Sequence, residues 1–219
     1  ILTSRLIDRA LRPLFPEDYL CDVQVLISLI SSDAEVLPDA LACLAASAAL
    51  AVSDIPIQEI ISEVRIGRKN GEFIVNPSRT ELKECDLEFI IAATEKNIMM
   101  VEGEAKECQE EDLIKAIELA HDAVKAQIQA QVDLRAQLGN IGKREYTKPY
   151  RNEELNAKIT EFAKDKMYAI SASASAKHER SDAFDALKKE VKEFLGEELP
   201  AEDKALLGHY FGAVQYYVV

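Results

Sequence analysis

Apolar and polar positions follow two different periods along the chain, and each change of period marks a predicted element. Residues 3–12 (TSRLIDRALR) place apolar side chains at helical spacing, which predicts a helix that Pro13 ends. The run 22–30 (DVQVLISLI) is apolar on both faces and rich in strand-favouring residues, so we expect a central strand. An alanine-rich helix is predicted to begin at Pro38 and to end near Pro56.

The middle of the chain has the period-two pattern that is typical of strands. Val-Arg-Ile and Phe-Ile-Val lie on either side of Asn70-Gly71, a dipeptide in which both positions tolerate a positive φ. This arrangement predicts a β-hairpin within 63–74. The remaining elements predicted in this half are a short helix over 78–84, strands over 86–93 and 98–104, and a long helix over 109–138 that Gly139 caps.

A segment rich in glycine and basic residues divides the chain into two parts. Residues 140–149 form a predicted linker between a mixed domain over 1–139 and a domain over 150–219 in which no strand is predicted. The helices expected in the second part cover 152–166, 175–195 and 201–219. The charge changes at the same place, because residues 1–139 hold 13 Lys and Arg against 25 Asp and Glu, whereas 140–219 hold 13 against 14.

The composition narrows the class of protein. With 219 residues, of which 48% are hydrophobic and 30% charged, the chain can bury a core and is not disordered by composition. No apolar run is long enough to cross a bilayer, so we expect no membrane association and a cytoplasmic location. The net charge of -13 argues against nucleic-acid binding by bulk positive charge, although a local basic surface can still bind RNA. The four cysteines lack metal-binding spacing and are expected to be reduced thiols.

Both ends of the sequence interrupt a predicted element. The first residue is Ile rather than Met, and a helical pattern begins at once. The last helical pattern, over 206–219, contains no residue that would end it. We therefore expect the sequence to be a piece of a longer protein.

Two sets of charged residues could carry chemistry. Arg5, Arg9 and Arg12 recur at helical spacing and form what we call the arginine ridge, which could bind phosphates or could be a solvated helix face. Asp86 and Glu88 alternate at a strand start and would share one face, near enough to hold a Mg²⁺ together, or would be ordinary edge residues. No nucleophile motif or glycine-rich phosphate loop is present, so the residues alone identify no catalytic group.

Several stretches resemble the polynucleotide phosphorylase family, and together they cover essentially the whole chain. They are SRLIDRALRPLFPEDYLCDVQV, LPDALACLAASAAL, NPSRTELKECDLEFIIAATEKNIMMVEGEA and RNEELNAKI. The resemblance implies an α+β fold, with an RNase PH-like core domain of the ribosomal protein S5 domain 2-like class, lacking its N-terminal strands, followed by a small all-helical domain. It also implies a homotrimeric parent that degrades RNA from the 3′ end with inorganic phosphate and Mg²⁺, releasing nucleoside diphosphates.

The same resemblance implies that this part of the parent is not catalytic. The second core domain of the family, which carries the catalytic machinery and the Mg²⁺, would follow this sequence. In that copy a serine-rich turn binds phosphate and two acids hold the metal, whereas here the matching positions are the alanine-rich stretch 43–47 and the pair Thr80 and Asp86. We therefore expect no catalytic residue, keep Asp86 and Glu88 only as weak metal candidates, and assign the arginine ridge to RNA, phosphate or trimer contact.

The residues leave more than one function open. The first is that the chain supplies RNA-channel wall and trimer surface to a phosphorolytic exoribonuclease and is inactive alone. The alternative is a protein-interaction or regulatory module with no RNA role of its own, which the near-neutral charge of 140–219 favours for the helical part. An independent small-molecule enzyme is disfavoured, because no nucleophile or metal constellation is present.

Overall fold

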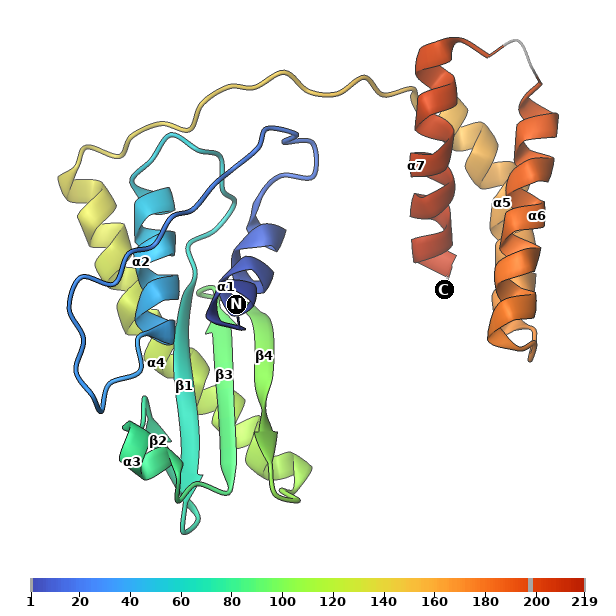
Figure 1. Cartoon of the computed structure of the whole chain (residues 1–219). Helices are drawn as coiled ribbons and strands as arrows, with labels where there is room; N and C mark the ends of the chain where they lie inside the picture. The colour runs from blue at the N-terminus through green and yellow to red at the C-terminus, as the bar shows by residue number, and fades with distance from the viewer. Residues whose placement is uncertain (1, 197–198, 219) are drawn as a thin grey trace. The chain divides into compact units, whose positions relative to one another are not determined.

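Two separate units make up the chain in the computed structural model, which describes residues 2–196 and 199–218. The first unit is Ile1–Lys148 and the second is Pro149–Val219. The first unit combines helices with one sheet, and the second contains only helices among its described residues (Figure 1). The predicted α+β class is therefore confirmed.

One antiparallel sheet forms the centre of the first unit. Its strands are β1 (Ser62–Lys69), β2 (Glu72–Val75), β3 (Leu87–Ala93) and β4 (Ile98–Ala105), in the order β2-β1-β3-β4. The predicted hairpin is confirmed, since Asn70 and Gly71 have φ values of 53° and 83° and join β1 to β2. A short helix, α3 (Arg79–Leu82), follows, and Ser78 caps it by accepting a hydrogen bond from the Glu81 N–H.

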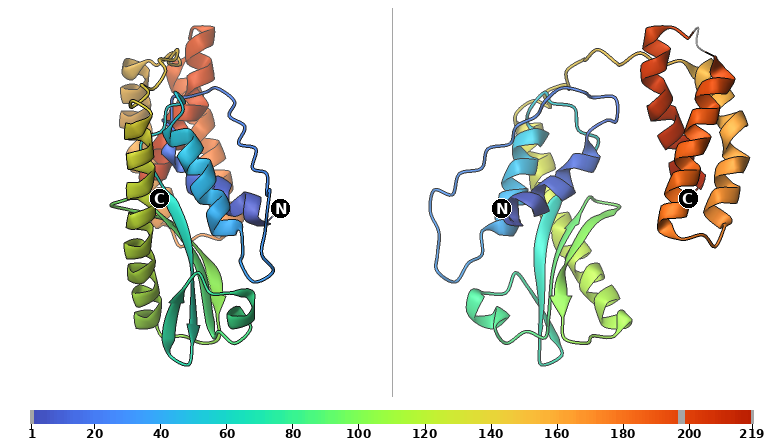
Figure 2. Two further views of the ribbon diagram at one scale, coloured as in Figure 1. Left: turned by 90° about the vertical axis from the view of Figure 1, so that its left-hand side faces the viewer. Right: turned by 45° about the vertical axis from the view of Figure 1, so that its right-hand side comes forward.

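Helices cover both faces of this sheet (Figure 2). One face carries the long helix α4 (Glu110–Gln137), and the other carries α1 (Leu2–Leu11) and α2 (Asp39–Ala51), with the short 3₁₀ helix Arg12–Leu14 after α1. Alternate residues of β3 supply the two cores: Leu87 and Ile91 pack with α4, whereas Ile90 and Ala92 pack with α1 and α2. Both cores therefore use the period-two pattern of the same strand.

The run 22–30 is not a strand, which corrects the prediction of a central strand there. Leu26 is 90% exposed and Ile30 is 97% exposed, and within the described residues no strand pairs with this segment. An apolar run on its own does not create a strand, because each strand needs a partner to satisfy its backbone groups.

The stretch after α4 is attached to the first unit although it has no regular structure. The Lys143 ammonium donates to the carbonyl oxygens of Leu50 and Ser53, at 2.9 Å each, and so caps the C-terminal end of α2. The Tyr146 hydroxyl donates to Asp18 at 2.6 Å. Residues 140–148 of the predicted linker therefore belong to the first unit, and Lys143 and Tyr146 attach them to it.

The second unit is a bundle of three helices. They are α5 (Glu153–Ala172), α6 (Lys177–Leu195) and α7 (Ala201–Val218). Asn152 caps α5, accepting from the Leu155 N–H at 3.0 Å, and its side-chain amide donates to Asp203 of α7 at 3.0 Å. Helix α5 runs beyond its predicted end at 166, and residue 219 of the last predicted helix lies outside the described residues. Among the residues described, no helix has the length and apolar character needed to cross a membrane.

Gly103 of β4 allows a close approach that no other residue type would permit. A β-carbon at this position would lie 2.1 Å from the carbonyl oxygen of Glu88 and 2.7 Å from the Phe89 α-carbon. We expect Gly103→Ala to lower the free energy of unfolding by about 2 kcal/mol or more, measured by urea denaturation, since the β3–β4 pairing must shift. Gly142→Ala is the matched control, because nothing lies within 4 Å of its β-carbon position. Equal stability of the two variants would contradict this reading of the contact.

Candidate functional site

The three members of the arginine ridge differ in their partners in the structure. Arg9 of α1 forms an ion pair with Glu102 of β4. Arg12 pairs with Asp8 one helical turn earlier, at 2.6 Å. Arg5 is exposed and has no ion pair or hydrogen bond to any described residue. Arg5 is therefore the member of the ridge whose guanidinium is not already paired with a described carboxylate, while the exposed pairs of Arg9 and Arg12 contribute at most about 1 kcal/mol each.

Asp86 belongs to an ion-pair cluster on the α4 side of the sheet, which we call the Arg68 cluster. The Arg68 guanidinium of β1 binds Asp86 through two bonds, at 2.8 and 3.0 Å, and binds Asp112 in the first turn of α4 at 2.5 Å. These hydrogen bonds from Arg68 lower the pKa of the Asp86 carboxyl. Asp86 is therefore held ionised by a guanidinium.

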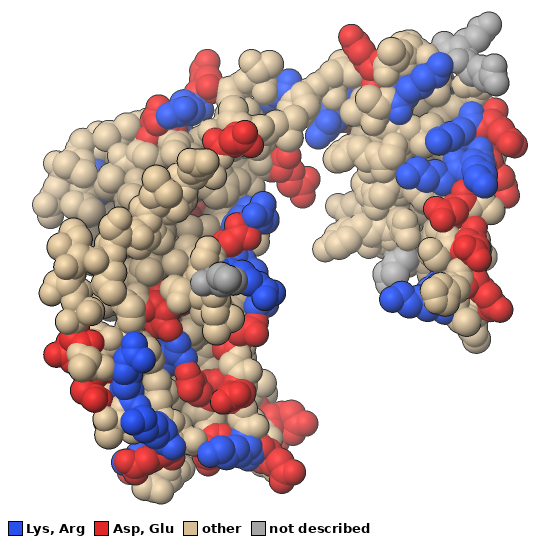
Figure 3. Space-filling view, in the orientation of Figure 1, with Lys and Arg blue, Asp and Glu red and all other residues tan. Residues whose placement is uncertain are grey.

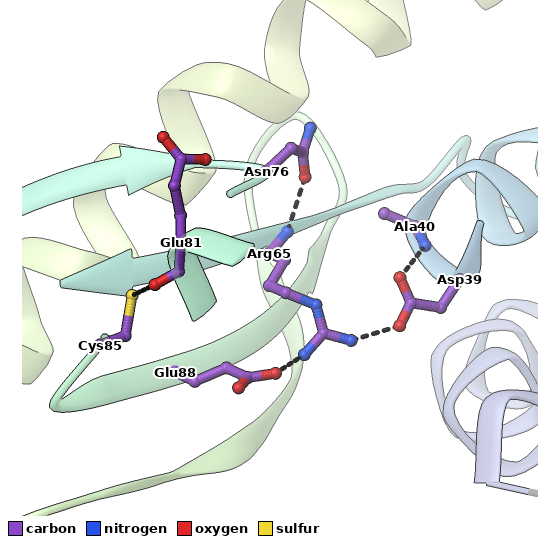
Figure 4. Close-up of polar contacts among 7 residues, drawn as sticks. All are labelled: Asp39, Ala40, Arg65, Asn76, Glu81, Cys85 and Glu88. Atoms are coloured by element: carbon purple, nitrogen blue, oxygen red, sulfur yellow. Dashed lines mark hydrogen bonds and ion pairs between the residues drawn. The ribbon is translucent and has the colours of Figure 1, made fainter. Parts of the chain in front are cut away.

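Glu88 belongs to a second cluster, which lies on the α2 side of the sheet and which we call the Arg65 cluster. The Arg65 guanidinium donates to Glu88 of β3 and to Asp39 at the start of α2 (Figure 4). Asp39 also accepts a hydrogen bond from the Ala40 N–H at 2.9 Å. The Arg65 and Asp39 side chains are each 12% exposed, so this pair is largely shielded from water.

The two clusters show why Asp86 and Glu88 do not form a metal site. Arg65 and Arg68 are three positions apart in β1, so their side chains extend from opposite faces of the sheet. The carboxylates of Asp86 and Glu88 follow these two arginines and are not brought together, contrary to the expected one-face arrangement. No group of three metal-ligating side chains occurs among the residues that the structure describes. Asp86 and Glu88 therefore do not fit a bound Mg²⁺.

The stretch 43–47 lies in the interior of a helix. Cys43 and Ser47 are in the second and third turns of α2 and are buried against β1. The Ser47 hydroxyl accepts a hydrogen bond from the Ile61 N–H at 3.1 Å. Neither residue lies at a helix start, where free N–H groups could bind a phosphate.

Glu63 is a buried acid that the sequence analysis missed. It lies in β1 two residues before Arg65 and shares the face toward α2, where the Cys43 thiol is its neighbour. The side chain is 0% exposed, and neither carboxylate oxygen has a hydrogen-bond partner among the described residues. Burial raises the pKa of Glu63 to about 7, while its contacts with Cys43 and Arg65 act in the opposite direction.

The sequence held a signal for these missed residues. In the segment SEVRIGRK, Val64 and Ile66 alternate with Glu63 and Arg65, which are opposite in charge and share one face. The helix side of the pairing is not visible in the sequence, because Asp39 is separated from Arg65 by 26 positions.

The charged side chains are mixed on the one face of the molecule that Figure 3 shows. On the face shown in Figure 3, Lys and Arg atoms lie beside Asp and Glu atoms. This agrees with the ion pairs that occupy Arg9, Arg12, Arg65 and Arg68. Any contact with an anionic polymer must therefore depend on few side chains.

Comparisons with known proteins agree on one family. The profile of the 3′ exoribonuclease family, domain 1, matches residues 1–56, and that of the same family, domain 2, matches residues 59–123. The chain is 50% identical over 216 residues to the polyribonucleotide nucleotidyltransferase of Parabacteroides distasonis and 49% identical over 211 residues to that of Christiangramia forsetii. It covers 98% and 96% of its own length in these alignments, but spans only 29% and 28% of the two relatives. A weaker likeness links it to the crystal structure of rice Rrp46, with a TM-score of 0.38 and 20% identity over 48% of each chain.

The burial of Glu63 predicts how the free energy of unfolding depends on pH. Its pKa in the folded chain, about 7, lies above the ordinary value of 4.5, so the folded state keeps the proton to higher pH than the unfolded state does. The free energy of unfolding should therefore fall by about 3 kcal/mol as pH rises from about 4.5 to about 7. Glu63→Gln should remove this fall, as measured by urea denaturation at several pH values.

The matched control for this prediction is Glu72→Gln, which removes an exposed carboxyl from β2. This variant should keep the pH dependence of the original chain. A Glu63→Gln variant whose stability follows pH in the same way as the original chain would show that Glu63 does not titrate in this range.

Proposed function

The chain belongs to the 3′ exoribonuclease, or RNase PH, family over residues 1–123, and from this we propose that it is a non-catalytic part of a polynucleotide phosphorylase. The parent enzyme degrades RNA from the 3′ end by phosphorolysis, in the cytoplasm and as a homotrimer. In that assembly this chain contributes wall to the RNA channel and surface to the trimer. The relatives that support the parent activity are named polyribonucleotide nucleotidyltransferases.

One observation carries the non-catalytic part of the proposal. The two metal candidates, Asp86 at one of the family's metal positions and Glu88, are each bound to an arginine, and these arginines extend from opposite faces of the sheet. A phosphoryl-transfer site needs carboxylates that converge on a metal ion and leave it open to the substrate. Here the guanidinium groups take the place that a cation would need.

Mg²⁺ and inorganic phosphate therefore bind elsewhere in the proposed parent. When bound there, Mg²⁺ would supply charge stabilisation at the phosphoryl group that phosphate attacks. Thr80, at the position where the family's catalytic copy has its other metal-binding acid, lies in α3, and its N–H donates to Glu35 at 3.0 Å. In this proposal, no residue of this chain takes part in a chemical step that uses the metal.

The arginine ridge supports the role in RNA contact. A single-stranded RNA presents a line of phosphates, and guanidinium groups bind phosphates through paired N–H donors. Arg5 is free to make such a contact, while Arg9 would have to share its guanidinium with Glu102. The same surface could instead pair with carboxylates of a neighbouring subunit.

The proposal predicts that the purified chain is inactive alone. With poly(A), Mg²⁺ and phosphate, we expect no release of nucleoside diphosphates, while far-UV circular dichroism shows that the chain is folded. Robust release would overturn the placement of the catalytic centre outside this chain. Asp86 and Glu88 would then be the first residues to substitute.

A second prediction tests the arginine ridge in the intact enzyme. Arg5→Glu and Arg9→Glu should weaken RNA binding and reduce the slope of log affinity against log salt by about 0.7 for each lost phosphate contact, or should weaken trimer formation. Arg79→Glu is the control, since Arg79 is also exposed but lies at the start of α3 and does not belong to the arginine ridge. Unchanged salt-dependent affinity together with unchanged trimer mass would reject this role and favour a protein-interaction module.

A further inference from the structure

A cavity of about 290 Å³ lies in the first unit between the start of α2, strand β1 and the segment that leads into α3. Glu63 and Arg65 line it from β1, Asp39 lines it from α2, and Glu81 lines it from α3. It does not include any member of the arginine ridge, nor Asp86 or Glu88. The cavity is thus separate from the groups considered for RNA and for metal.

The charge balance of this cavity is negative. Four acids line it, namely Glu35, Asp39, Glu63 and Glu81, and Arg65 is the one guanidinium among the described residues of its lining. An anion would meet more carboxylates than cations there. A ligand that improves the balance must carry a positive charge.

The acids of the cavity differ in whether they already have partners. Asp39 is bound to Arg65, the Glu81 carboxylate accepts from the Ser78 N–H at 2.8 Å, and Glu35 accepts from the Thr80 N–H at 3.0 Å. Glu63 alone of the four has two carboxylate oxygens that no described residue satisfies, although it is fully buried. A buried carboxylate without a partner costs considerable free energy, which a cation at this point would recover.

Part of the remaining lining is apolar and suits a hydrocarbon chain, while Asn76, Ser78 and Gln127 add polar groups. Val36, Leu37 and Leu41 line the cavity from the start of α2 and the segment before it, and Pro77 lines it from the segment before α3. Methylene groups placed against these side chains would leave water, at a gain of about 0.8 kcal/mol for each one that is fully buried. The cavity therefore combines one unsatisfied carboxylate with an apolar wall.

We propose that this cavity binds a small aliphatic ammonium compound, whose charged nitrogen pairs with Glu63 and whose methylene groups lie against Leu41 and Pro77. A divalent metal ion fits less well, since the described residues provide no group of three ligating side chains. The proposal does not depend on the role in RNA degradation, because none of these residues belongs to the arginine ridge.

The test is isothermal titration calorimetry of the full chain with n-butylammonium chloride at pH 7, compared with NaCl at the same ionic strength. We expect saturable binding to the original chain and no binding signal with NaCl. Titration in phosphate and in MOPS buffer should show that protons are released as the ligand binds. Burial raises the pKa of Glu63 to about 7, and the bound cation favours its charged form.

Variants assign the binding to Glu63. Glu63→Gln should weaken the affinity by about tenfold or more and abolish proton release, whereas Glu72→Gln, which removes an exposed carboxyl outside the lining, should do neither. Leu41→Lys changes a side chain that is 57% exposed and should also weaken binding, because it places an ammonium group beside the cavity. This variant keeps the test valid if Glu63→Gln does not fold.

Equal affinity of the original chain and Glu63→Gln would overturn the proposal, as would heats that NaCl reproduces. Binding of MgCl₂ but not of butylammonium would overturn it in favour of a metal site. RNA phosphorolysis by the intact enzyme is a separate readout, so failure of this proposal leaves the proposed function untouched.

Discussion

The guanidinium of Arg65 fixes the arrangement of the first unit, because it joins three elements at one point. It comes from β1 and holds Asp39 of α2 and Glu88 of β3, largely out of water. Such a group contributes little net stability compared with an apolar core, since the charges lose their hydration on burial. Its effect is on specificity, because any other placement of α2 would leave buried charges without partners, at a cost of about 3–5 kcal/mol.

A match of spacing extends this contact along the whole helix. Asp39, Cys43 and Ser47 recur every four residues in α2, about 6 Å apart. They meet Arg65 and Glu63 of β1 and the N–H of Ile61 just before this strand, which recur every two residues, about 6.7 Å apart. The helix can therefore run antiparallel to the strand with one polar contact for each turn. Alanines between these positions allow the close approach that buries Glu63, and this burial raises its pKa.

The sequence predicted those parts of the fold that short-range chemistry decides. The Asn70-Gly71 turn, the short helix α3 and the length of α4 depend on neighbouring residues and agree with the pattern. The strand expected over 22–30 and the shared face of Asp86 and Glu88 depend on partners that are distant in sequence. Both of these predictions were wrong. Strand alternation marks Glu63 and Arg65 as one face, but it cannot reveal that the face is covered by α2.

The same ion pairs that specify the fold limit how this chain can contact RNA. In a chain with a net charge of -13, long-range electrostatics oppose the approach of a polyanion. Arg65 and Arg68 are already neutralised inside the first unit, and Arg9 and Arg12 have carboxylate partners on its surface. What remains is a contact at short range by single exposed groups such as Arg5. Within the proposed parent enzyme, an RNA contact by this chain would therefore be local, and most of the affinity for RNA would have to come from other parts of that enzyme.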